Sequence, residues 1–251
     1  MSLAGVHTGP MSSPAHDAAA FLRTHVRDEV ALADVADAVG YSPFHLSRQF
    51  TAAIGMSPMR YLACHRFHLA KHLLLTEDLG VVHVCHEVGF SSPGTFTRRF
   101  RSEVGVTPGE LRVVADDVAD HSPTPFRMAP PAQASVTGRV ETPESAGSEP
   151  LVWIGLFAHP APTGVPGAGL LRHGPGEFQL PVVPGFPWLL ATVVSASADP
   201  ITQLADDDPF IAVHPSPVLG PVDVTLSFRR ALPWEPPILT ALPALRKIGV
   251  S

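Results

Sequence analysis

Hydrophobic residues recur at helical spacing in the first part of the chain. Residues 32–39 place apolar side chains on one face of a short helix, and Gly40 suits its end because glycine readily adopts a left-handed conformation. Ser42 and Pro43 form a typical helix start, with a capping side chain and a first-turn proline. In the helix that follows, the inward positions are spaced by four residues: Leu46, Phe50 and Ile54. The pattern predicts two helices joined by a glycine turn.

The same pattern returns fifty residues further along the chain. SPFHLSRQF at 42–50 aligns with SPGTFTRRF at 92–100, and GMSP at 55–58 aligns with GVTP at 105–108. Residues 59–76, between the copies, contain no helix breaker and predict a connector helix about 25 Å long. Each copy has the form of a helix-turn-helix unit, whose second helix enters the major groove of DNA. In the second copy the inward positions are Phe96, Phe100 and Val104.

The repeat resembles a known family. Three stretches carry the resemblance: VGYSPFHLSRQF at 39–50, RFHLAKHLLLTEDLGVVHVCHEVGFSSPGTFTRRF at 66–100 and GVTPGEL at 105–111. With them, residues from about 18 to 112 resemble the DNA-binding domain of the AraC/XylS family of bacterial transcription regulators. The resemblance covers under half of the chain. It implies an all-α N-terminal domain of seven helices, with two helix-turn-helix units joined by a connector helix, that binds specific promoter DNA.

The resemblance also implies which side chains meet DNA. They lie on or near the outer faces of the two second helices: Phe44, His45, Ser47, Arg48 and Thr51 in the first unit, and Pro93, Gly94, Thr95, Thr97, Arg98, Arg99 and Arg101 in the second. Arg48 and Arg98 occupy equivalent positions, and arginine to guanine is the commonest specific contact, whereas Arg99 and Arg101 suit phosphates. Three alternatives stay open: Arg48 as a solvated surface arginine, Phe44 as a core residue and His45 as a merely exposed side chain.

Alternating patterns replace helical ones in the last hundred residues. Apolar residues alternate with polar ones at 222–228 and at 178–182, and short apolar runs flanked by Pro or Gly occupy 151–158, 188–195 and 210–214. Together with a possible strand at 170–173, these segments predict an all-β sandwich. A short helical or irregular tail over 239–248 is expected to close it. The segment weakly resembles transthyretin-like and carboxypeptidase-regulatory-type sandwiches.

Aromatic residues of this second half are candidates for a ligand pocket: Trp153, Phe157, Phe186, Trp188, Phe210 and Trp234. The alternative interpretation is that they form the core of a small sandwich. The pocket is the basis for expecting a small-molecule effector.

Charge and composition then set the domain boundaries. The formal net charge of −6 argues against a nucleic-acid partner, but residues 15–115 are neutral, with ten basic and ten acidic side chains. The 28 prolines and 20 glycines indicate a loop-rich part. We expect a disordered N-terminus over 1–14, the DNA-binding domain over 15–115, a flexible Pro/Ala-rich acidic linker over 116–149, and a β-sandwich for effector binding or dimerisation over 150–251.

Metal and catalytic chemistry find little support in the sequence. His65, His68 and His72 have helical spacing, and a zinc site is conceivable, but exposed or partly buried histidines are the favoured interpretation. For Asp206–Asp208, a solvated acidic loop is favoured over a calcium site. Two cysteines exclude a disulfide scaffold. We therefore predict no metal, no cofactor, no catalytic residue and no enzymatic activity.

The combined prediction is a sequence-specific transcription regulator. Its expected partners are double-stranded promoter DNA, a small-molecule effector, a second copy of the chain and, for an activator, RNA polymerase. The chain shows no long apolar run and no secretory signal, so we expect a cytoplasmic protein without a membrane partner. Two alternatives remain: a C-terminal sandwich that binds another protein and no ligand, and, less favoured, a DNA-targeted enzyme.

Overall fold

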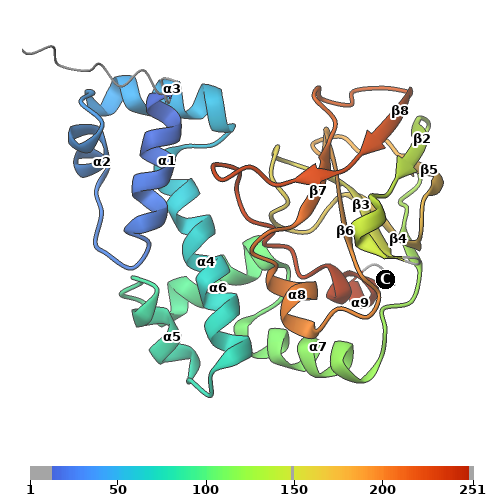
Figure 1. Ribbon diagram of the computed structural model, residues 1–251, viewed down its shortest axis with the longest axis horizontal. Helices are drawn as coiled ribbons and strands as arrows, with labels where there is room; N and C mark the ends of the chain where they lie inside the picture. The colour runs from blue at the N-terminus through green and yellow to red at the C-terminus, as the bar shows by residue number, and fades with distance from the viewer. Residues whose placement is uncertain (1–12, 148–149, 249–251) are drawn as a thin grey trace, which may run out of the picture.

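Seven helices occupy the first half of the chain in the computed structural model, which describes residues 13–147 and 150–248 (Figure 1). They are α1 (Pro14–Thr24), α2 (Leu32–Ala38), α3 (Pro43–Ile54), α4 (Pro58–Thr76), α5 (Val81–Glu87), α6 (Pro93–Val104) and α7 (Pro108–Asp120). The number of helices agrees with what the family resemblance implied, and α2 to α6 lie where the sequence pattern predicted the two copies and their connector. Except for residues 13 and 14, the segment expected to be disordered lies outside the described residues.

Caps of the predicted kind fix the ends of α3 and α6. The Ser42 hydroxyl accepts a hydrogen bond from the backbone N–H of His45, and the Ser92 hydroxyl accepts one from that of Thr95, both at 3.4 Å. Gly55 ends α3 with φ 83°, and the glycine that ends α6 has φ 91°. Each helix therefore begins and ends at the residue where local sequence chemistry requires it.

The predicted inward positions form the helical core. Leu46 and Phe50 are fully buried, as are Phe96 and Phe100 in the second copy. The connector helix α4 places Phe67 among the aromatic rings of the second copy, with its ring centroid 6.0 Å from that of Phe96 and 5.9 Å from that of Phe100. Helix α4 thus carries the core from the α1–α3 group to the α5–α7 group (Figure 1).

Within the described residues, nine strands of the second half form two sheets. The six-stranded sheet has the order β1-β4-β3-β6-β7-β9, and the three-stranded sheet has the order β5-β2-β8. The strands are β1 (Phe126–Met128), β2 (Ser135–Glu141), β3 (Leu151–Phe157), β4 (Ala168–His173), β5 (Gly176–Pro181), β6 (Trp188–Val194), β7 (Phe210–Val213), β8 (Val222–Ser227) and β9 (Arg229–Arg230). Pairing is antiparallel except between β2 and β8. Both sheets contribute to one buried core, with Val136 and Leu180 from the smaller sheet and Ile154 and Leu189 from the larger.

The segment expected to be a flexible linker, 116–149, is wrongly assigned. It holds the end of α7, the edge strand β1, the central strand β2 and a short 3-10 helix, η1 (Glu144–Ala146). Strand β2 buries Val136 and Val140 completely. The composition of the segment hid this strand, although its valines alternate with polar residues as strand residues do. The sheet region therefore begins at Phe126.

The second half is also not all-β. Helix α8 (Pro200–Ala205), the 3-10 helix η2 (Leu242–Ala244) and α9 (Leu245–Ile248) accompany the sheets. On the outer face of the six-stranded sheet, Leu242 and Leu245 pack with Trp153 and Leu171. The helical tail over 239–248 is as predicted, whereas α8 was not expected. No helix within the described residues has the length and apolar character to cross a membrane.

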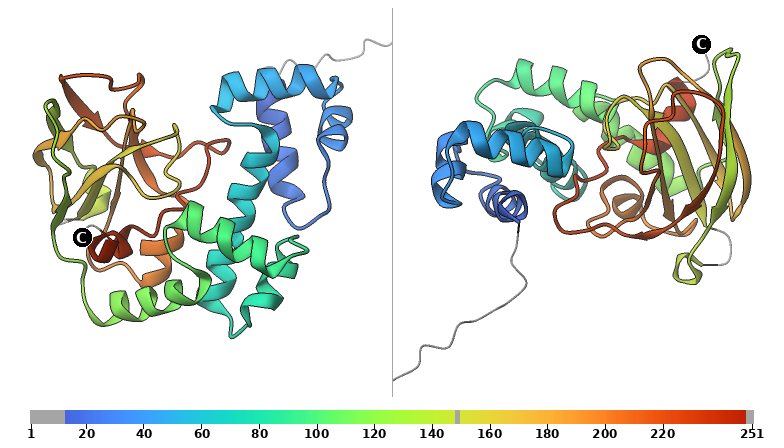
Figure 2. Two further views of the ribbon diagram at one scale, coloured as in Figure 1. Left: turned by 180° about the vertical axis from the view of Figure 1, so that it is seen from behind. Right: turned by 90° about the horizontal axis from the view of Figure 1, so that it is seen from above.

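The two halves lie side by side (Figure 2) and share a buried core. Backbone hydrogen bonds also join them, such as that from the N–H of Ala241 to the carbonyl oxygen of Val104 at 2.8 Å. Leu204, Leu239 and Ala241 from the second half belong to the buried cluster of the helical half. The fully buried Lys71 of α4 donates hydrogen bonds from Nζ to the carbonyl oxygens of Ile238 and Leu239, at 3.0 and 3.1 Å. The halves therefore pack directly against each other.

Candidate DNA-binding surface and interdomain cavity

The outer face of α3 presents an aromatic ring and an arginine to solvent. Phe44 is 73% exposed, which excludes the core alternative, and Arg48 is also exposed. The Arg48 guanidinium carbon lies 5.8 Å from the centroid of the Phe44 ring. His45 is exposed, and its Nε2 lies 2.7 Å from Nε2 of Gln49. Thr51 is exposed and Ser47 half-buried, so the five predicted residues share one accessible surface.

The matching surface of α6 is more uniformly basic. Arg98 and Arg101 are exposed, Gly94 is exposed, and the side chains of Pro93, Thr95 and Thr97 are half-buried. Arg99 is placed differently, because its guanidinium carbon lies 5.5 Å from the ring centroid of Phe90 and 5.7 Å from that of Phe67. Arg99 therefore covers the aromatic cluster of the second copy, in addition to any contact with phosphate.

The C-terminal half leaves these two surfaces uncovered but contacts the ends of both helices. A Cβ on Gly55 would lie 2.7 Å from Cγ of Pro160, so the end of α3 requires glycine for close approach as well as for its positive φ. At the end of α6, the N–H of Gly164 donates to the carbonyl oxygen of Glu103 at 2.6 Å. The loop over 158–166, which we call the proline loop, thus contacts both helix ends.

A mostly apolar cavity of about 170 Å³ lies behind the proline loop. Its lining includes Pro160, Pro162 and Pro166 of this loop, Ala53 and Ile54 of α3, and Trp153, Phe157 and Trp234 of the second half. The Trp234 ring also stacks on His16 of α1, with the centroids 4.0 Å apart. The cavity is therefore walled by both halves of the molecule.

Only half of the predicted aromatic pocket residues line this cavity. Phe186 and Phe210 are partly buried against the core between the sheets. Trp188 pairs in register with Phe157 but is absent from the cavity lining. For these three residues the core or strand interpretation fits the structure better, because none of them lines the cavity.

Glu235 is the one acidic side chain in the cavity lining over the described residues. Burial raises its pKa, but hydrogen bonds from Arg229 and from the Leu232 N–H outweigh burial, so the pKa is lowered overall. The guanidinium of Arg229 contacts both carboxylate oxygens, at 2.7 and 2.6 Å. The charge is already paired, which leaves an apolar cavity suited to a neutral occupant.

Sequence reasoning missed Gln49 and the proline loop. Gln49 lies one turn after His45 and shares its exposed hollow, together with Ala52. The sequence signal for Gln49 was its position one helical turn after His45, together with an amide side chain that can hydrogen-bond a base. The proline loop had no such signal, because its role depends on contacts with residues more than fifty positions away.

Comparisons with known proteins agree with the helical half. Residues 35–113 match a family model described as a helix-turn-helix domain. The HTH-type transcriptional activator RhaS of Escherichia fergusonii is 36% identical over 93 residues, which cover 37% of this chain and 34% of that protein. The uncharacterized HTH-type transcriptional regulator YfiF of Bacillus subtilis is 32% identical over 127 residues, covering 48% and 39%. The chain thus spans between a third and two fifths of these relatives.

Two solved structures are also similar to part of this chain. The DNA-binding domain of AdpA, a global transcriptional factor in complex with a target DNA, is 26% identical with a TM-score of 0.40 and covers 42% of this chain and 96% of that one. A regulator of Chromobacterium violaceum with an AraC-type DNA-binding domain is 27% identical with a TM-score of 0.39, covering 40% and 89%.

Proposed function

We propose that this chain, whose residues 35–113 form a helix-turn-helix domain of the AraC/XylS family, is a transcription regulator that binds specific double-stranded DNA through α3 and α6. The observation that carries the proposal is the outer face of α3. Phe44 exposes most of its ring to solvent beside the Arg48 guanidinium, and both side chains suit a groove of DNA. The intact chain leaves this face accessible.

Each side chain has a role in this proposal. Arg48 and Arg98 donate to guanine O6 and N7, Phe44 contacts a thymine methyl group, and Gln49 is available to adenine. Arg101 contacts phosphate and fixes the position of α6 on the duplex. Because Lys71 is the only lysine between residues 15 and 115 and is buried, few cations face phosphate, and we expect a shallow dependence of affinity on salt.

Selection of bound fragments from a random duplex pool tests the DNA proposal. We expect an enriched sequence, bound by the full chain in the presence of excess unrelated duplex. Arg48→Ala and Arg98→Ala should each weaken it about 10- to 100-fold, as loss of a bidentate base contact does. Arg139→Ala, an exposed arginine on β2, is the matched control and should bind normally. No enrichment, or equal loss in the control, would overturn the proposal.

The cavity supports a second part of the proposal, an effector site. A small apolar molecule bound there contacts the proline loop, which packs against the ends of α3 and α6. The occupant would therefore bias the relative placement of the two DNA-contacting helices. The volume of about 170 Å³ is similar to an apolar cavity that holds benzene, so we propose a neutral molecule of about one ring.

Tryptophan fluorescence tests the effector site, because Trp153 and Trp234 line the cavity. A panel of neutral single-ring compounds should include one that changes the emission of the full chain and raises its Tm. Ala53→Phe should abolish both effects by filling the cavity at an exposed helix position, while Val113→Phe on the exposed face of α7 should not. If no compound acts, or if Ala53→Phe responds like wild type, the effector site is wrong while DNA binding stands. Three other partners expected from the sequence stay predictions: a protein in place of the ligand, a second copy of the chain and RNA polymerase.

A further inference from the structure

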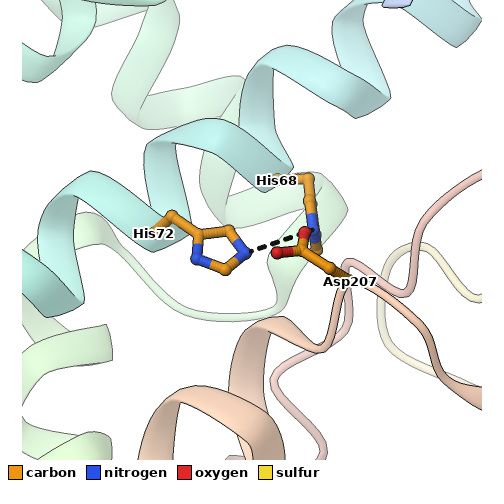
Figure 3. Close-up of side chains that lie close together, drawn as sticks. All are labelled: His68, His72 and Asp207. Atoms are coloured by element: carbon orange, nitrogen blue, oxygen red, sulfur yellow. Dashed lines mark hydrogen bonds and ion pairs between the residues drawn. The ribbon is translucent and has the colours of Figure 1, made fainter.

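Two histidines of α4 and one aspartate of the second half converge where the halves meet (Figure 3). His68 and His72 are four residues apart and therefore share one face of the helix. Asp207 follows α8 and approaches from the opposite side. Its Oδ1 atom lies 2.8 Å from Nε2 of His68 and 3.2 Å from Nε2 of His72. No pattern in the sequence joins Asp207 to the two histidines, because it lies more than 130 positions from either of them.

Hydrogen bonding alone does not satisfy this cluster. His68 Nε2 and Asp207 Oδ1 form a hydrogen bond, but the buried Nε2 of His72 has no hydrogen-bond partner among the described residues, although it faces the same oxygen. A buried ring nitrogen without a partner is costly. Burial lowers the pKa of His68, despite the opposing hydrogen bond to Asp207. Neutral imidazole is the form that binds a metal ion.

The separations fit a tetrahedral metal site. Bonds of about 2.0–2.2 Å from a zinc ion to nitrogen and oxygen place neighbouring tetrahedral ligands about 3.3 Å apart. The two Nε2–Oδ1 distances are 2.8 and 3.2 Å, and the three ligand atoms all lie within 4.8 Å of one another. An outward movement of a few tenths of an ångström by the aspartate would accommodate the ion.

The ligand set and the exposure favour one kind of ion. Two imidazoles and a carboxylate suit Zn²⁺, whereas Mg²⁺ and Ca²⁺ prefer oxygen ligands throughout. The Asp207 side chain is 77% exposed, so the ion can enter from solvent and keep a water molecule as its fourth ligand. The neighbouring carboxylates are engaged elsewhere: Asp208 pairs with Arg230 at 3.4 Å, and Asp206 accepts the N–H of Asp208 at 2.9 Å.

We propose that His68, His72 and Asp207 bind one Zn²⁺ ion that ties the connector helix α4 to the C-terminal half. The inference is independent of the DNA and effector proposals. Because the ligands come from both halves, the ion binds only the packed arrangement and stabilises it. The site therefore couples the availability of zinc to the placement of the C-terminal half against α4, the helix between the α2–α3 and α5–α6 pairs.

The experiment uses the full chain, produced without a histidine tag and stripped with a chelator that is then removed. Calorimetric titration with Zn²⁺ should give one ion per chain, and Co²⁺ as a probe should give the visible absorption bands of a four-coordinate site. Zn²⁺ should raise the Tm, and Mg²⁺ at the same concentration should not. Absence of stoichiometric Zn²⁺ binding, or an equal effect of Mg²⁺, would overturn the proposal.

Variants locate the ion. Asp207→Asn and His72→Gln should each weaken Zn²⁺ binding at least tenfold and remove the rise in Tm, while His86→Gln, an exposed histidine on α5, should leave both unchanged. Asp207 is largely exposed, so its asparagine variant is expected to fold, and circular dichroism verifies this. If Asp207→Asn folds and binds Zn²⁺ with the affinity and Co²⁺ spectrum of the wild type, the ion lies elsewhere and the proposal is wrong.

Discussion

Arg66 and Arg112 bind backbone carbonyl groups within the helical half. Arg66 of α4 donates to the carbonyl oxygens of Val26, Asp28 and Gly89, at 3.0, 2.6 and 3.1 Å. It thereby joins the loop before α2 to the turn before α6. The sequence alone does not distinguish such arginines from those that face solvent, such as Arg48. The sequence does not show which backbone carbonyl groups lack a hydrogen-bond donor in the folded chain.

We expect Arg66→Ala to destabilise the protein by about 2 kcal/mol, since it leaves three carbonyl groups without their charged donor. Arg66→Lys should recover only part of this, because one ammonium group cannot reproduce the planar fork. Urea denaturation followed by circular dichroism measures both. Arg139→Ala, on the surface of β2, is the control and should change stability by less than about 0.5 kcal/mol. An Arg66→Ala variant as stable as this control would contradict the expectation.

Glu110 gives a pH-dependent effect at the start of α7. Its carboxylate accepts the N–H of Thr107 at 2.7 Å in a capping box, and these hydrogen bonds lower its pKa. A carboxyl with a lowered pKa stabilises the fold above its unfolded pKa, and this contribution is lost as the pH falls through its folded value. Glu110→Gln should therefore lower the Tm at pH 7 and have a smaller effect at pH 3. A Tm difference that does not depend on pH would argue against this role.

At the scale of elements, the sequence predicted the helices and strands whose positions depend on local features of the chain. Helices α2, α3, α5 and α6 follow from periodicity, serine caps and terminal glycines, and strands β3 to β8 follow from apolar runs and alternation. Strand β2 was missed because its surroundings are rich in proline and alanine. The cavity walls and the His–Asp cluster could not be predicted for another reason. Each is formed by contacts between the two halves, and such contacts leave no pattern in the sequence of either half.

Gly138, at the centre of β2, tests the structural role of the segment that looked like a linker. A Cβ there would lie 2.1 Å from the carbonyl oxygen of Val224 on β8. Gly138→Ala should therefore push the two strands apart and destabilise the protein by about 1–3 kcal/mol, as overpacking does. Gly220→Ala is the matched control, because a Cβ at Gly220 meets nothing within 4 Å. Equal denaturation midpoints for both variants would mean that β2 does not pair as described.

At the scale of the whole molecule, the two halves stabilise each other. The helical core is completed by Leu204, Leu239 and Ala241, and the buried Lys71 places its ammonium group on two carbonyls of the second half. With a flexible linker between the halves, an effector domain would influence DNA binding only by holding two copies of the chain together. Direct packing offers another route, in which a change at the interface reaches α3 and α6 through the proline loop and α4.

Truncation after residue 121 tests this mutual stabilisation. The fragment keeps all seven helices but exposes apolar surface that the second half covers, so we expect a lower Tm than in the full chain and binding of a hydrophobic dye. Calorimetry of the full chain should show one cooperative transition rather than two, because the cores are continuous across the interface. A full chain that melts in two steps, the first or second of them at the Tm of the fragment, would show that the halves unfold independently, and the route from the cavity to the DNA-binding helices would then lose its physical basis.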